Sequence, residues 1–285
     1  MNKVESYTTL SGESYKFDPE KEISASEWTF IEEYLEHDSK RYSNFLESSH
    51  NELLSLSVLS PERFSKLQLN IDLNKLHEEL LEMRGNRFDS EEFFSAATAS
   101  KLLFPSSTPD LKPNEDVKER LYNCDLFQDG ILDNKVLQFK VLFPDQKIIP
   151  DEFLYDQDES FASWESLRNE IVEDLKRSPD QKDFKRLIQA KMMYPEHSNE
   201  IVLSAEDISY LQNNFQTKKE RFNYIADNLK AEKEKGSSYS YSFDGDIDYT
   251  PWKKDVGDFI ESATLLKLFS AKELNIYRPG FIEVE

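Results

Sequence analysis

The sequence is poor in the residues that several common architectures need. It has one cysteine, Cys124, so no disulfide bond can form within the chain. Its 285 residues include 7 glycines, which argues against a glycine-rich phosphate loop, a dinucleotide-binding turn and a β-sandwich with many tight turns. No stretch approaches the roughly 20 apolar residues of a transmembrane helix, and residues 1–18 lack the basic start and apolar centre of a signal peptide. These absences predict a cytoplasmic protein that does not bind membranes.

Positive charge is also scarce. The chain has 35 Lys and Arg residues against 56 Asp and Glu residues, and its formal net charge is −21 at pH 7. Nucleic-acid phosphates and anionic membranes repel such a chain, because it cannot release their counterions. The charge balance therefore argues against nucleic acid as a partner and favours another protein with a basic surface. A solvated acidic surface that keeps the protein soluble is the simpler interpretation of the same charge.

Apolar residues are abundant enough to form a sizeable core, since 38% of the chain is hydrophobic and 20 residues are Phe. They recur at spacings of three and four residues, which is typical of one buried face on an α-helix. Three of the clearest stripes are Trp28, Ile31 and Leu35; then Ile208, Leu211, Phe215, Phe222, Ile225 and Leu229; and finally Val256, Phe259, Ile260, Ala263 and Leu266.

A short signature recurs along the chain. Lys, two aliphatic residues, an aromatic residue and Pro follow one another at 101–105, 140–144 and 191–195, and weaker copies stand at 56–61 and 266–270. Because proline has no amide hydrogen and clashes with the preceding turn, each copy predicts the end of a helix. The Lys can lay its stem along apolar surface, and its charge suits a helix C-terminus. We interpret each copy as the end of the second helix of a helical hairpin.

The first four copies recur about every 40 to 50 residues, which is in or near the spacing of two-helix repeats, and the last unit is stretched by its long helix and linker. The sequence therefore predicts an all-α fold, an irregular array of about five helical hairpins that either stack as an α-solenoid or pack as a compact helical bundle. This interpretation depends on Phe104, Phe143 and Tyr194 occupying equivalent places at the ends of matching hairpins. The Lys-Leu-Leu-Phe-Pro type of ending, recurring between acidic helices over residues 56–270, resembles helical-repeat proteins of uncultured bacteria. That resemblance implies a helical-repeat fold and brings with it no activity and no functional residue.

The organisation of the chain follows from its helical and non-helical segments. Residues 1–22 have no helical period and are predicted to form a flexible, loosely attached N-terminal arm. The helical array is predicted over 23–235, a linker rich in Ser, Tyr and Gly over 236–249, and a last helix with a tail packed on the array over 250–285.

Local signals predict where individual helices start. Ser24 and Glu27 form a capping box, in which each side chain can accept a hydrogen bond from the other residue's backbone amide. Residues 178–181 (SPDQ) combine a cap, Pro at the first helical position and Gln three residues after the cap. Ser204 opens the longest predicted helix, which fades at 232–236.

The best candidate for a metal site is the group Asp244, Asp246 and Asp248, because alternating carboxylates can converge on one hard cation. Asp255 occupies the twelfth position of an EF-hand count from Asp244, but Tyr249 stands where the sharp turn needs Gly. We therefore expect a solvated acidic linker here rather than a calcium site.

No catalytic or cofactor-binding residue is predicted. The histidines at positions 37, 50, 77 and 197 are scattered, and surface side chains explain them better than metal ligands do. Carboxylate pairs are too common in so acidic a chain to identify an acid–base couple. The leading hypothesis is a non-catalytic interaction scaffold or adaptor with an acidic surface. An enzyme whose site is assembled from dispersed Asp, Glu and His residues is the alternative, followed by an acidic nucleic-acid mimic or a calcium-binding protein.

Overall fold

The computed structural model describes residues 7–8, 14–15, 17–38, 50–67, 69, 71–86, 91–104, 106, 111, 142, 164–193, 195–234 and 249–270. Within these residues the fold is all-α, which confirms the predicted class. The exception is a short antiparallel ladder in which β1 (Tyr7–Thr8) pairs with β2 (Ser14–Tyr15).

The helices follow one another along the chain and are separated by turns, loops and the segments outside the described residues. They are α1 (Pro19–Glu22), α2 (Ala25–Asp38), α4 (His50–Leu59), α5 (Pro61–Phe64), α6 (Leu73–Asn86), α7 (Glu91–Leu103), α10 (Trp164–Lys176), α11 (Phe184–Met193), α12 (Ala205–Glu234) and α13 (Lys253–Ser270), with 3₁₀ turns η2 (Pro179–Gln181), η3 (Pro195–Glu200) and η4 (Thr250–Trp252).

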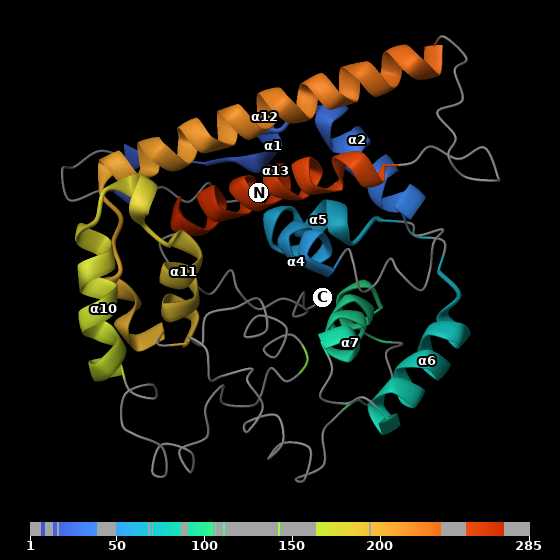
Figure 1. Cartoon of the computed structure of the whole chain (residues 1–285), viewed down its shortest axis with the longest axis horizontal. Helices are drawn as coiled ribbons and strands as arrows, with labels where there is room; N and C mark the ends of the chain where they lie inside the picture. Colours follow the sequence, from blue (N-terminus) through green and yellow to red (C-terminus); the bar gives the residue numbers. More distant parts are fainter. Residues whose placement is uncertain are drawn as a thin grey trace.

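Helix α13 lies at the centre of the fold, between α12 and α4 (Figure 1). Its predicted stripe is confirmed, because Val256, Phe259, Ile260, Ala263 and Leu266 are each 0% exposed. Burying a large apolar side chain contributes about 1.5–3 kcal/mol. This stripe is therefore the main apolar contact that α13 offers to the helices on its two sides.

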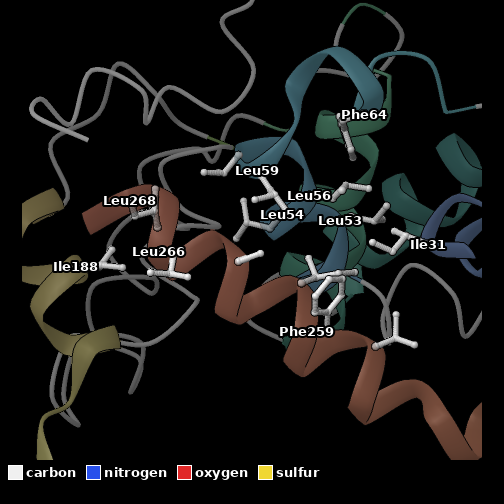
Figure 2. Close-up of a cluster of buried hydrophobic side chains, with 14 of the residues drawn as sticks. Ile31, Leu53, Leu54, Leu56, Leu59, Phe64, Ile188, Phe259, Leu266 and Leu268 are labelled. Atoms are coloured by element: carbon white, nitrogen blue, oxygen red, sulfur yellow. The ribbon is translucent and has the colours of Figure 1, made fainter. Parts of the chain in front are cut away.

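The ring of Phe259 connects α13 to α12. It stacks on two rings of α12, with centroid distances of 5.6 Å to Phe215 and 4.5 Å to Phe222. The leucines of α4 pack along the same helix, and Ile188 of α11 lies beside Leu266 (Figure 2). One contiguous core thus joins helices from both ends of the described chain.

The helices beyond α4 extend this core. Helix α7 packs on α4, and α6 packs on α7 (Figure 1). Residues 93–100 of α7 are buried on every side, including the polar residues Ser95, Thr98 and Ser100. Because the stretch consists largely of Ala, Ser and Thr, neighbouring segments can approach its backbone closely.

Most copies of the signature end helices as predicted. Helices α7 and α11 end at Leu103 and Met193, and the weaker copies end α4 at Leu59 and α13 at Ser270. Phe104 is half-buried against the core. Of the copy at 140–144 only Leu142 is described, and Phe143 and Tyr194 lie outside the described residues. The equivalence of the three aromatic residues stays a prediction.

The contact between α13 and α4 bears on how the hairpins are arranged. It joins the last predicted hairpin to the first, whereas units of a stacked array touch only their sequence neighbours. A contact between helices so far apart in the chain is typical of a compact bundle. The repeat itself remains a prediction.

Two predicted boundaries differ from the structure. The start signal at residues 178–181 gives the 3₁₀ turn η2, and α11 begins only at Phe184, after an extended residue, Lys182 (φ −79°, ψ 137°). The segment predicted as a free N-terminal arm is folded from Phe17 onward, since this ring is buried and meets Phe215 edge-on at 5.4 Å. A single aromatic residue has no period, so the sequence pattern did not reveal it.

Candidate functional site

The most acidic part of the described chain is the segment that forms α1 and α2. Residues 17–38 contain eight acidic residues and one basic residue, Lys21. Helix α2 starts at the predicted capping box, in which the Ser24 amide donates to Glu27 Oε2 at 2.7 Å and the Glu27 amide donates to Ser24 Oγ at 3.3 Å. Lys219 of α12 lies 3.3 Å from the same Glu27 oxygen. Glu27 is thus buried and has a structural role.

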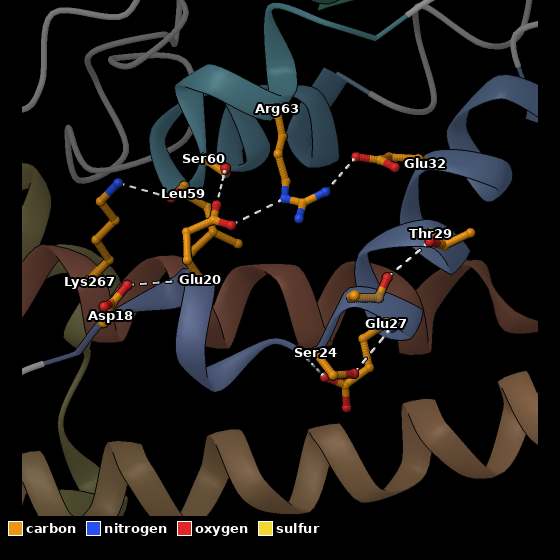
Figure 3. Close-up of polar contacts among 11 residues, drawn as sticks. Asp18, Glu20, Ser24, Glu27, Thr29, Glu32, Leu59, Ser60, Arg63 and Lys267 are labelled. Atoms are coloured by element: carbon orange, nitrogen blue, oxygen red, sulfur yellow. Dashed lines mark hydrogen bonds and ion pairs between the residues drawn. The ribbon is translucent and has the colours of Figure 1, made fainter. Parts of the chain in front are cut away.

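Two other carboxylates of the segment hold Arg63, which α5 presents toward α1 and α2 (Figure 3). Its Nε lies 3.4 Å from Glu20 Oε2, and its terminal nitrogen donates to Glu32 Oε1 at 3.1 Å. The guanidinium carbon also lies 5.0 Å from the ring centroid of Trp28, within the range of a cation–π contact. Ser60 donates to the other oxygen of Glu20 at 2.9 Å. This contact set fixes α5 against α1 and α2.

The solvent side of α2 carries three glutamates, Glu32, Glu33 and Glu36, which we call the α2 acidic face. Glu33 and Glu36 are exposed, and Glu32 is partly exposed beside Arg63. With 3.6 residues per turn, these positions fall within about a third of the helix circumference. The face is therefore a compact group of negative charges on one side of a rigid helix.

Aromatic and imidazole rings of α2 contact Tyr249, the residue directly before η4. The Tyr249 ring lies at centroid distances of 6.3 Å from Phe30, 5.6 Å from Tyr34 and 4.8 Å from His37. Burial of the Tyr249 hydroxyl raises its pKa, and the negative charge of Glu33 and the hydrogen bond to Glu33 raise that pKa further. The neutral hydroxyl donates to Glu33, so one residue of the α2 acidic face is also held in place.

The four histidines lie on separate elements. His37 lies on α2, His50 begins α4, His77 lies on α6 and His197 lies on η3. The His197 ring stacks on Trp164 at 4.7 Å, and its Nδ1 lies 2.8 Å from Glu200 Oε1. The Arg168 guanidinium, and then His197, lower the pKa of Glu200 through their hydrogen bonds to it. Within the described ranges, no group of three or more His, Cys, Asp and Glu residues is placed to hold a metal ion.

The residues of the candidate calcium loop are placed only in part. Asp244, Asp246 and Asp248 lie outside the described residues, as does Cys124. Asp255, the twelfth position of the loop count, is in the first turn of α13, and its Oδ1 lies 2.6 Å from Arg221 Nε in an ion pair. The solvated acidic linker stays a prediction for the other three residues.

A buried ion pair that sequence reasoning missed joins Lys182 to Asp207, with side chains 4% and 2% exposed. Asp207 also closes the capping box of α12, accepting hydrogen bonds from the Ser204 amide at 2.9 Å and the Ser204 hydroxyl at 2.8 Å. The predicted helix start at Ser204 is confirmed, and the spacing of Ser204 and Asp207 is that of a helix cap. Nothing in the sequence indicates that the partner of Asp207 is Lys182, an extended residue shortly before α11.

No protein-family model, no curated protein and no solved structure matches this chain. None of the helices in the described ranges has both the length and the apolar character of a membrane-spanning segment. The proposed function therefore depends on charge and geometry alone.

Proposed function

We propose that this protein is a non-catalytic scaffold or adaptor that binds a basic surface of another protein through the α2 acidic face. The observation that carries the proposal is the grouping of Glu32, Glu33 and Glu36 on one solvent-facing side of α2. At about 0.15 M salt, charges interact over a screening length of about 8 Å. Carboxylates on adjacent turns, about 5.4 Å apart along a helix, therefore act together on an approaching cation. We extend the proposal to a cytoplasmic location, because a single cysteine suits a reducing compartment.

The uses of the buried carboxylates support a non-catalytic role. The buried acids of the described ranges are Glu27, Asp174 and Asp207. Glu27 and Asp207 close capping boxes, and Asp174 accepts from Arg177 at 2.9 Å and from the backbone amide of Asp183 at 3.3 Å. A catalytic acid or base must be able to exchange a proton with substrate. Each of these three groups is instead engaged in contacts that hold a helix or turn.

Two double variants with equal charge test the proposal. Glu33→Gln with Glu36→Gln removes the two exposed charges of the α2 acidic face and leaves Glu32, which is paired with Arg63. The amide oxygen that this change introduces at position 33 can still accept the hydrogen bond from the Tyr249 hydroxyl. Glu78→Gln with Glu82→Gln removes two exposed charges from α6 and serves as the matched control. Each full-length chain is immobilised and exposed to extract at low and moderate salt, and the proteins captured are quantified by mass spectrometry. Affinity for a lysine- and arginine-rich peptide is measured in parallel.

The α2 variant should lose captured basic proteins and bind the peptide several-fold more weakly, while the α6 variant retains both. Capture by the unaltered chain should fall as salt rises, because screening weakens contacts between exposed charges. Equal losses in both variants would show that only net charge matters and would overturn the assignment to α2. Capture of nothing at either salt concentration would remove the scaffold proposal altogether.

A further inference from the structure

We draw no further inference here: the strongest candidate, the outer face of α12 around the exposed Tyr224, carries nothing because nothing in the structure shows what covers it.

Discussion

The buried ion pair between Lys182 and Asp207 leads to a prediction about stability. Both side chains are almost completely removed from water, at 4% and 2% exposed. Removing a charge from water costs several kcal/mol, and the attraction between the two charges offsets that cost only while both are present. Deleting Asp207 alone, which leaves the buried ammonium without its partner, should therefore destabilise the fold more than deleting both residues.

The two single variants should lose different amounts of stability. Lys182→Met leaves Asp207 with its two hydrogen bonds from Ser204 and with the positive end of the α12 dipole, so we expect a loss of about 2 kcal/mol. Asp207→Asn leaves a buried ammonium with no other partner within the described residues and weakens the cap, so we expect about 4 kcal/mol. The double variant should lose about 2 kcal/mol, mostly from the weakened cap.

The measurement is urea unfolding of the four proteins, followed by far-ultraviolet circular dichroism and by tryptophan fluorescence so that two-state behaviour is checked. If the two losses added, the double variant would lose about 6 kcal/mol, so the expected coupling is about 4 kcal/mol. At about 2 °C per kcal/mol, Asp207→Asn should lower the melting temperature by about 8 °C. Additive single effects would refute the ion pair as a coupled element.

Three further substitutions test the packing around α2, α7 and α13. Because the pKa of Tyr249 is raised in the folded state, its contribution to stability is complete below the unfolded pKa of about 10 and is lost as pH rises further. Tyr249→Phe should therefore lose less stability than the unaltered protein between about pH 9 and 11 in urea titrations; equal losses would contradict this. Thr98→Val should be neutral or stabilising by about 1 kcal/mol, because the Thr98 hydroxyl is buried without a hydrogen-bond partner within the described residues; a loss above about 1 kcal/mol in thermal unfolding would reveal a partner. Gly257→Ala should also stabilise by up to about 1 kcal/mol through helix propensity, since the nearest atom to its Cβ among the described residues would be the end of the Glu52 side chain, at 3.0 Å; Gly257→Leu is the overpacked control and should cost about 1–3 kcal/mol.

The sequence predicted the faces of individual helices well. The stripes on α12 and α13 are buried at every predicted position, because apolar spacing directly encodes the side of a helix that leaves water. The capping box at Ser24 and Glu27 is formed as predicted, because it depends only on residues three apart. Such features are local, so no knowledge of the partner helix is required to predict them.

The sequence could not predict which buried face meets which. Apolar burial is not directional, so the stripe of α13 did not indicate that this helix would contact α4 as well as its sequence neighbour α12. The same limitation explains the error at residues 178–181. Pro179 at the first position suits a 3₁₀ turn as well as an α-helix, and the extended backbone at Lys182 accompanies a long-range bond to Asp207.

The candidate site likewise has local features that the sequence predicts and long-range contacts that it does not. Glu33 and Glu36 of the α2 acidic face could be assigned to solvent because they lie off the stripe of Trp28, Ile31 and Leu35, whereas Glu32 stands one turn after Trp28, beside that stripe. Their partners could not be assigned, because Arg63 comes from a short helix, α5, 31 positions after Glu32 in the chain. Local periodicity therefore identifies the acidic surface, and only the tertiary fold separates its exposed charges from those engaged in structure.

The lysine of the last signature copy shows how a local pattern can serve a distant contact. Its position near the end of α13 suits the dipole of its own helix. In the structure, the ammonium of Lys267 donates to the backbone carbonyls of Val58 and Leu59, each at 2.9 Å, at the C-terminus of α4. Lys219 of α12 similarly donates to the carbonyl of Glu22 at the end of α1. Because the final carbonyls of a helix have no partner within that helix, these lysines complete helices near the start of the chain from its other end. These hydrogen bonds therefore link α13 to α4 and α12 to α1, in addition to the apolar packing of the shared core.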